Sequence, residues 1–339
     1  MNSSSLVFNA SVIHALVDQL LSDLSTPLDQ LEAARLLHSG LNQLAGPSAL
    51  GSQETTSRFG KALAAVDAGN CLVDHLRTRL FLKAVDAQIR DLARAGTVKV
   101  LYAGCGPFAT LMLPLLGRLG DLDLRIEAWD CHRDSVDALG RIMSALAIPP
   151  DRLIVRQADA LTAWPVMTTA PNLIIAEVMQ RALTREPQVA IMARLGRDFP
   201  KARFVPRQID LRLIAMDPGV EFSFDQQTPE RVRVDLGWAP VFVPNLLGQD
   251  PVVCAGLDQA GDALAFAGDL TVPELPSGCD TLAVLTRVEL GNGLELGDYD
   301  SGITQPLLMQ QAGRLKTGQR LRCGYRMSAD PGPVVERLD

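Results

Sequence analysis

The sequence predicts an α/β protein with a doubly wound parallel sheet, followed by a β-barrel or β-sandwich section and preceded by an extra helical segment. Between residues 98 and 203, short apolar runs alternate with stretches of helical spacing, which is the pattern of parallel strands joined by helices. After about residue 203, short alternating runs separated by Gly, Pro and Asp indicate an all-β section. Residues 8–45 show helical spacing alone.

The helical patterns at the start fall into two groups. Apolar residues repeat at helical spacing from Val12 onward, and Pro27 opens a second helix. After a polar break, residues 58–95 predict a further helical stretch. We therefore expect three parts: an N-terminal helical segment (dimerisation or lid), a nucleotide-binding domain and a β-barrel-like substrate domain, at 1–57, 58–203 and 204–339.

The strands and helices after residue 98 are predicted from apolar runs and from the residues that separate them. Four runs predict buried strands, at 98–103, 124–129, 153–157 and 173–176. Three stretches between or after them predict helices, at 111–119, 135–146 and 189–195. Five runs predict strands of the all-β section, at 209–214, 231–235, 264–267, 281–289 and 319–326.

Composition excludes several classes of function. The chain has 339 residues and a net charge of −7, which argues against a nucleic-acid surface. The six cysteines and four histidines do not fall at zinc-ligand spacing, so we expect no metal and reduced thiols. No run of eighteen apolar residues and no signal peptide stand out, so we expect a cytoplasmic protein without a membrane partner.

A glycine turn follows the first predicted strand. Gly104-Cys105-Gly106 lets the backbone pass close to a ligand, and Asp130 ends the next strand, where ribose hydroxyls are bound in doubly wound sheets. The alternative is a tight turn that only packs a helix on a strand. The third glycine of a dinucleotide fingerprint is missing and Pro107 removes a backbone donor, which favours a smaller ligand such as S-adenosylmethionine.

Two glutamates, Glu177 and Glu186, lie nine positions apart after the apolar run at 173–176. A guanidinium is a planar cation with five donors, and two facing carboxylates can hold it through charge-assisted bonds. We therefore interpret the pair as a clamp for such a cation. The alternative is that Glu177 caps a turn and Glu186 is solvated before Pro187.

With these motifs, residues 58–328 resemble class I S-adenosylmethionine-dependent methyltransferases, and specifically protein arginine methyltransferases and their small-molecule relatives. The matching segments, in the family's order, are 74–78, 100–106, Asp130, 158–159, 176–179 with Glu186, and 204–211. The resemblance implies a Rossmann-like fold and catalytic roles for Glu177 and Glu186. It implies cofactor contacts for eight residues: Arg77 (on the methionine carboxylate), Gly104, Cys105, Gly106, Asp130 (on the ribose), Ala158, Asp159 and Glu177.

The chain also departs from the family. Tyr102 stands where the family has an acid, and the segment at 301–303 lacks the His and Trp of the family's Thr-His-Trp loop. The family's dimerisation arm has no clear counterpart between 215 and 260, while the helices at 8–45 are extra. These departures suggest a relative that acts on free L-arginine or another guanidino compound, in natural-product biosynthesis. The N-terminal helices could replace the arm as the contact of a homodimer, which we expect, or they could cover the pocket.

Three alternatives stay open at this point. The acceptor could be a peptide or protein arginine. The enzyme could transfer or cyclise the aminocarboxypropyl group of S-adenosylmethionine. The chain could also be a binding or scaffold module that keeps only the fold of a methyltransferase.

Overall fold

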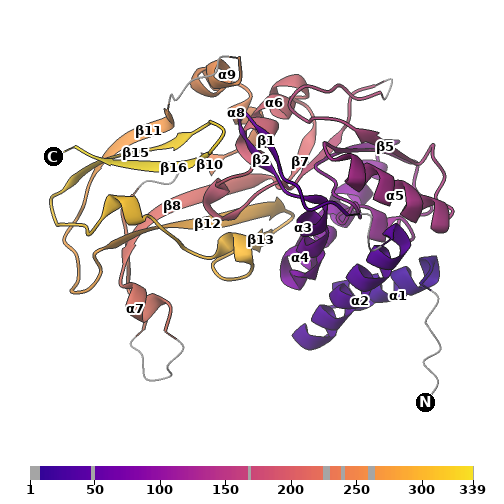
Figure 1. The fold of residues 1–339 in the computed structure, drawn as a ribbon, viewed down its shortest axis with the longest axis horizontal. Coiled ribbons are helices and arrows are strands. Elements are labelled where there is room, and N and C mark those ends of the chain that lie inside the picture. Colours follow the sequence, from indigo (N-terminus) through magenta and orange to yellow (C-terminus); the bar gives the residue numbers. More distant parts are fainter. Residues whose placement is uncertain are drawn as a thin grey trace.

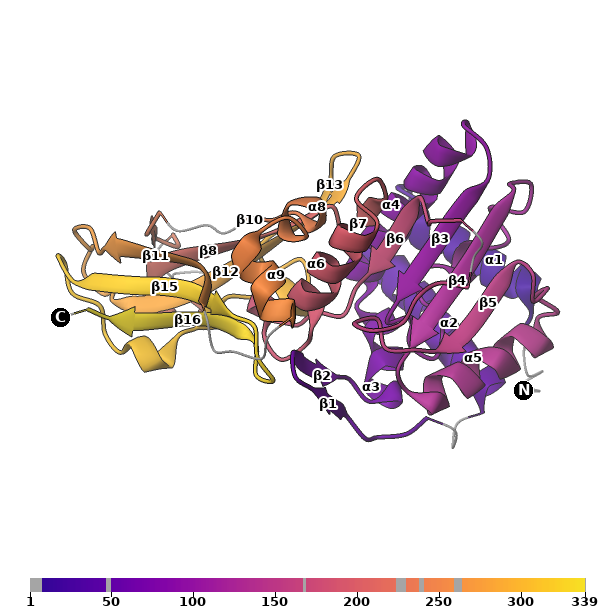
Figure 2. The same cartoon turned by 90° about the horizontal axis from the view of Figure 1, so that it is seen from above.

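A computed structural model describes residues 8–46, 50–166, 169–223, 230–237, 241–258 and 264–338. The molecule is elongated, with a parallel-sheet half that carries the first two helices and a β half that holds the described end of the chain (Figures 1 and 2). A hairpin near the start of the chain lies at the junction of the two halves (Figure 2). This arrangement places the carboxyl ends of the parallel strands close to the β half.

The N-terminal helices α1 (Ala10–Leu21) and α2 (Pro27–Ala45) form a helical pair, as their spacing predicts. Asn9 caps α1, and Thr26 and Asp29 form a capping box at the start of α2, so both first turns have partners for free backbone groups. Buried leucines on both helices pack the pair onto the parallel-sheet half, against α4 and α5 (Figure 1).

The central sheet is five-stranded and wholly parallel, in the order β5-β4-β3-β6-β7. Its strands are β3 (Val98–Ala103), β4 (Leu124–Asp130), β5 (Leu153–Gln157), β6 (Leu173–Ala176) and β7 (Arg203–Val205). The principal helices of this half are α4 (His75–Ala93), α5 (Arg133–Ala145) and α6 (Gln188–Asp198). The chain runs outward from β3 to β5 and then returns to β6, so the strand order reverses beside β3, where doubly wound sheets bind ligands.

Two sequence predictions for this half are wrong. The stretch at 58–95 is not one helix: it starts in the turn between the hairpin strands β1 (Thr55–Ser57) and β2 (Gly60–Ala62), and continues through α3 (Ala65–Asn70), η1 (Cys71–Val73) and α4. Residues 111–119 form turns around the short 3₁₀ helix η2 (Leu113–Leu115). Gly60 has a φ of 134°, which lies outside the helical region, so a helix cannot run through it. Ala109, just before the second stretch, has a φ of 42°, and the residues after it form turns instead of a regular helix.

The β half consists of two antiparallel sheets that form a sandwich. One contains β8 (Gln208–Met216), β9 (Arg233–Asp235), β10 (Val241–Phe242), β12 (Thr281–Gly291), β13 (Leu294–Leu296) and β14 (Leu307–Leu308). The other has the order β11-β15-β16, with β11 (Leu264–Thr271), β15 (Arg320–Arg326) and β16 (Gly332–Arg337). Phe242 of the first sheet meets Tyr325 of the second edge to face, with 5.4 Å between ring centroids.

In the described part of the β half, three short α-helices interrupt the strands, which alternating runs alone do not predict. They are α7 (Pro218–Glu221), α8 (Pro244–Leu247) and α9 (Pro251–Asp258), and each begins with a proline, which favours a first helical turn. Helix α8 lies against α6, where a Cβ at Gly196 would stand 2.1 Å from the Pro244 carbonyl oxygen. The two halves are therefore joined by close backbone packing between α6 and α8.

Over the described ranges, no helix is long and apolar enough to cross a membrane. The six cysteines are free thiols, and the described His, Cys, Asp and Glu side chains form no cluster of three or more that could hold a metal ion.

Candidate functional site

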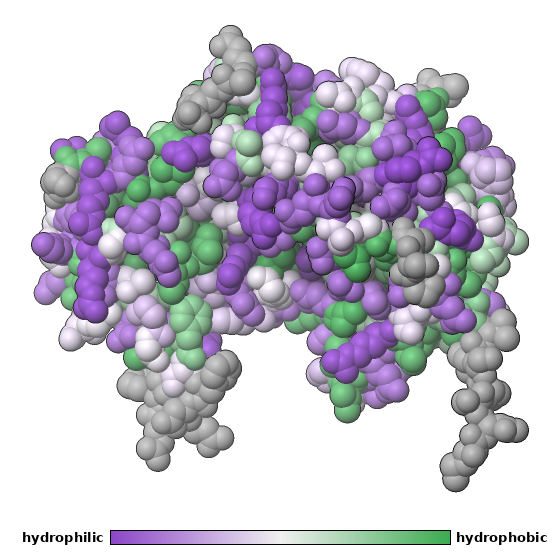
Figure 3. Space-filling model, viewed as in Figure 1, coloured by the Kyte–Doolittle hydropathy of each residue, from purple (hydrophilic) through white to green (hydrophobic). Residues whose placement is uncertain are grey.

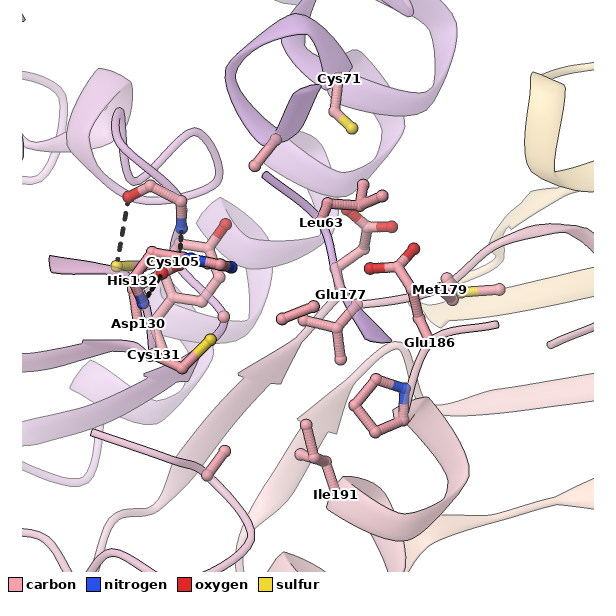
Figure 4. A pocket seen from close by; sticks show the side chains of 18 of the residues that line it. Leu63, Cys71, Cys105, Asp130, Cys131, His132, Glu177, Met179, Glu186 and Ile191 are labelled. Atoms are coloured by element: carbon pink, nitrogen blue, oxygen red, sulfur yellow. Dashed lines mark hydrogen bonds between the residues drawn. The ribbon is translucent and has the colours of Figure 1, made fainter. Parts of the chain in front are cut away.

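A cavity of about 270 Å³ lies at the carboxyl ends of β3, β4 and β6. All nine residues that the sequence places in a site line this one cavity: Arg77, Gly104, Cys105, Gly106, Asp130, Ala158, Asp159, Glu177 and Glu186. Figure 4 shows two ends, with Cys105, Asp130 and His132 at one and Glu177 and Glu186 at the other. The topology of a parallel sheet explains this gathering, because the segments that follow neighbouring strands meet at one edge.

The turn Gly104-Cys105-Gly106 passes close to the residues that follow β6. Gly104 and Gly106 have φ values of 71° and 62°, which favour glycine. A Cβ at Gly104 would stand 2.1 Å from Cγ1 of Val178, so the space beside the turn has no room for a side chain at that position. The turn therefore presents bare backbone to the cavity.

Asp130 links this turn to the end of β4. Its Oδ2 accepts a hydrogen bond from the Gly106 amide at 2.9 Å, and its Oδ1 accepts one from the His132 amide at 2.9 Å. Burial raises the pKa of the Asp130 carboxyl, and these two amide donors oppose the rise. Each carboxylate oxygen has a second lone pair, so Asp130 can accept hydroxyl donors from the cavity as well.

Ala158 and Asp159 continue the wall beyond β5. The Ala158 amide donates to the Asp130 carbonyl oxygen at 2.9 Å, and Asp159 accepts from the Leu161 amide at 2.8 Å. Asp159 thus stabilises its own turn and lines the cavity. Cys105 is buried, and burial raises the pKa of its thiol, so it is an uncharged neighbour here.

Glu177 follows the last residue of β6, and its side chain forms an ion pair with Arg77 of α4. Both side chains are about one-tenth exposed, at 9% and 10%. Burial raises the pKa of Glu177, while Arg77 opposes the rise. Arg77 Nη2 contacts Oε1 of Glu177, so Oε2 can accept from another cation.

Glu186 is 5% exposed, so the alternative of a solvated glutamate before Pro187 is wrong. Its carboxylate and that of Glu177 point toward one another (Figure 4). Burial, followed by the Glu177 charge, raises the pKa of Glu186 to about 8. Two buried carboxylates that face each other favour a cation between them, because it offsets both desolvation and mutual repulsion.

The raised pKa predicts a pH dependence of stability. The folded protein keeps a proton on Glu186 that the unfolded chain releases above about pH 4.5, so stability should fall as the pH rises from about 4.5 to about 8. The slope from this one group is at most roughly 1.4 kcal/mol per pH unit. Urea unfolding of the ligand-free protein at several pH values, compared with Glu186→Gln, measures it. Equal pH slopes in the two proteins would contradict the raised pKa.

Several lining residues were not predicted as part of the site. The β1–β2 hairpin and the residue after it contribute Thr55, Ser57, Ala62 and Leu63, and other elements contribute Cys71, Tyr102, His132 and Met179. Tyr102, which the sequence marks only as a departure from the family pattern, has a buried side chain that lines the cavity. No residue of α1 or α2 is among the described residues that line the cavity. The glycine at position 60 was the available signal for the hairpin.

The segment at 301–303 lies beside the site. Ser301 donates its hydroxyl to Asp74 Oδ2 at 2.5 Å, and the Gly302 amide reaches the same oxygen at 3.3 Å. Asp74 immediately precedes α4, whose first turn carries Arg77. The β half therefore contacts the start of the helix that presents Arg77.

Comparisons with known proteins bear on the fold. No family model matches the sequence, and no curated protein matches it. Among solved structures, the chain is similar to Arabidopsis thaliana protein arginine methyltransferase 10, with a TM-score of 0.51 and 12% identity over 76% of this chain and 86% of that chain. It also matches a chain of the Trypanosoma brucei PRMT1 enzyme–prozyme heterotetrameric complex with AdoHcy, with a TM-score of 0.49 and 14% identity over 79% and 96% of the chains. The similarity to the Arabidopsis structure confirms the predicted fold class, a doubly wound Rossmann-like domain followed by a β sandwich.

Proposed function

We propose that this protein is an S-adenosylmethionine-dependent N-methyltransferase that acts on the guanidinium of free L-arginine or a related small molecule. The observation that carries the proposal is the facing pair Glu177 and Glu186 in the same cavity as the glycine turn and Asp130. One end of the cavity suits an adenosine, and the other suits a planar cation. The similarity in fold to an arginine methyltransferase supports this assignment.

The residues present fit the cofactor. The side-chain-free turn at Gly104 leaves backbone against the cavity, and Asp130 offers a buried carboxylate for ribose hydroxyls. Ala158 and Asp159 would lie against the adenine, with the apolar side chains of Leu161 and Ile191 also lining the cavity. Arg77 would hold the carboxylate of the methionine part. When bound, S-adenosylmethionine supplies an electrophilic methyl group on a sulfonium sulfur.

The chain's own residues would then orient and deprotonate the acceptor. Glu177 and Glu186 would hold the guanidinium by charge-assisted hydrogen bonds and fix one nitrogen toward the methyl group. The nitrogen must lose a proton when its new N–C bond forms, and the Glu186 carboxylate can accept that proton. In the free protein a pKa of about 8 keeps Glu186 mostly protonated at neutral pH. A bound guanidinium would favour the charged form, so Glu186 would release that proton to solvent on binding and its carboxylate would then be free to act as the base.

The position of the β1–β2 hairpin at the cavity favours a small acceptor molecule over a protein. Thr55, Ser57 and Ala62 line the cavity from the β1–β2 hairpin. The Lys61 amide donates to the Arg185 carbonyl oxygen at 2.6 Å, so the hairpin is attached to the loop that carries Glu186. A free amino acid needs no open groove for a flanking polypeptide, whereas a protein substrate does.

Mass spectrometry of products tests the proposal. Incubation with S-adenosylmethionine and free L-arginine should yield arginine heavier by one or two methyl groups, together with S-adenosylhomocysteine. An arginine peptide panel in parallel should react much more slowly. Methylated peptides without methylated arginine would favour a protein substrate, and methylthioadenosine would indicate transfer or cyclisation of the aminocarboxypropyl group. No product and no cofactor binding would support a scaffold role.

We also propose a homodimer in the cytoplasm, with the arginine product feeding natural-product biosynthesis. Leu24, in the turn between α1 and α2, is 96% exposed, and Leu28, in the first turn of α2, is 71% exposed. Hydrophobic residues show at the lower tip of the helical pair (Figure 3). Burial of these leucines against a second copy would remove apolar surface from water. Light scattering of the wild type and of Leu24→Lys tests the association.

A further inference from the structure

The loop between β6 and α6 reaches Glu186 through an uncommon backbone path. Ala182, Leu183 and Arg185 have φ values of 55°, 55° and 67°. This left-handed region is one that residues other than glycine rarely adopt. Such a conformation persists only where its surroundings hold it in place. The contacts around this loop therefore decide where Glu186 points.

Two hydroxyl side chains of the β half contact the left-handed residues directly. Thr286 of β12 is fully buried, and its Oγ1 accepts a hydrogen bond from the Ala182 amide at 2.8 Å. Tyr325 of β15 is 1% exposed and donates its hydroxyl to the Leu183 carbonyl oxygen at 2.7 Å. The two strands belong to different sheets of the sandwich. Both sheets thus hold one short loop of the other half.

Backbone contacts and one partly exposed ion pair, between Arg185 and Glu54, complete the support. The Arg185 amide donates to the Pro331 carbonyl oxygen at 3.2 Å, and the Arg185 carbonyl oxygen accepts from the Lys61 amide. Substitutions cannot remove these two hydrogen bonds cleanly, because they involve backbone atoms. The two hydroxyls are therefore the buried part of the support that substitutions can test.

We infer that Thr286 and Tyr325 are positioning residues, which hold residues 182–185 in the backbone conformation that directs Glu186 into the cavity. Without the Thr286 oxygen, the buried Ala182 amide would lose its acceptor, and the loop would relax toward common φ values. Glu186 would then turn toward solvent. The meaning of this position for catalysis rests on the proposed function, but the position itself can be measured without activity.

The test compares Thr286→Val, which removes the acceptor at nearly the same volume, with Thr286→Ser, which keeps it. Tyr325→Phe removes the second hydroxyl, and Thr281→Val is a control on the same strand. We expect amide hydrogen exchange in the segment 177–188 to rise on the order of tenfold in Thr286→Val and Tyr325→Phe. Thr286→Ser should stay within about twofold of wild type, as should Thr281→Val.

A second readout follows Glu186 itself. Carboxyl titration by NMR should show the pKa of Glu186 falling from about 8 toward 4.5 in Thr286→Val, because the side chain gains water. With arginine as acceptor, kcat should fall on the order of tenfold or more, while affinity for S-adenosylhomocysteine stays within about twofold. Thr286→Ser should restore both.

The results separate this inference from the proposed function. Unchanged exchange and an unchanged Glu186 pKa in a folded Thr286→Val or Tyr325→Phe protein would overturn the inference. If the wild type transfers no methyl group to arginine, the proposed function fails, and the exchange and titration data still decide whether the hydroxyls position Glu186. Should Thr286→Val fail to fold, Tyr325→Phe carries the same readouts.

Discussion

Replacing Glu186 with Gln should lower kcat for methyl transfer to arginine by roughly a hundred- to a thousandfold, the loss seen when one preorganised electrostatic group is removed. The amide keeps the shape of the side chain, but it carries no charge for the guanidinium and cannot accept its proton. Affinity for S-adenosylhomocysteine should change little, because Glu186 lies at the far end of the cavity from Asp130 (Figure 4). Single-turnover kinetics and calorimetry measure the two quantities.

The exposed glutamate Glu295 offers a matched control. It pairs with Arg287 on the β half, and its side chain is 47% exposed, so Glu295→Gln should leave both kcat and affinity unchanged. A Glu186→Gln protein that turns over at the wild-type rate would remove Glu186 from the reaction. Equal losses of activity and of cofactor affinity would instead indicate a damaged cavity.

Replacing Arg77 with Met should destabilise the protein by about 3–5 kcal/mol above pH 7, because it leaves the buried Glu177 without its ion-pair partner. It should also weaken binding of S-adenosylhomocysteine, because the methionine carboxylate would lose its proposed cation. Urea unfolding and calorimetry measure these effects. Arg94→Met, at the end of the same helix and 82% exposed, should change stability by less than about 1 kcal/mol.

A double variant separates the two roles of Arg77. Combining Arg77→Met with Glu177→Gln removes both charges, so most of the lost stability should return. Cofactor affinity should remain low, because the cation for the methionine carboxylate is still absent. If the double variant recovers affinity as well as stability, Arg77 acts only through Glu177, and the proposed contact with the cofactor is wrong.

Local sequence patterns predicted that the glycine turn and Asp130 lie together, and both line one cavity. Gly104 and Asp130 follow adjacent parallel strands, and the topology of such a sheet brings these segments together wherever the rest of the chain goes. The spacing of Glu177 and Glu186 also led to the interpretation, since Glu177 follows β6 directly and Glu186 lies in the loop before α6. Their burial could not be predicted, because the hairpin that lines the same cavity and the β-half residues that hold the loop before Glu186 are distant in sequence.

Long-range contacts account for what the sequence did not predict. Residues 58–95 have apolar spacing compatible with a helix, but a Cβ at Gly60 would stand 2.6 Å from the Arg185 carbonyl oxygen, so the hairpin reflects packing against a distant loop. The Arg77–Glu177 pair joins residues 100 positions apart. Thr286 and Tyr325 lie in ordinary strand patterns, and nothing local marks their contacts with residues 182 and 183.

A crystal structure with S-adenosylhomocysteine and L-arginine tests the central claim most directly. We predict adenosine against Asp130 and the guanidinium between the carboxylates of Glu177 and Glu186, with one nitrogen facing the sulfur. An arginine bound through other side chains, or a nucleoside outside this cavity, would contradict the assignment.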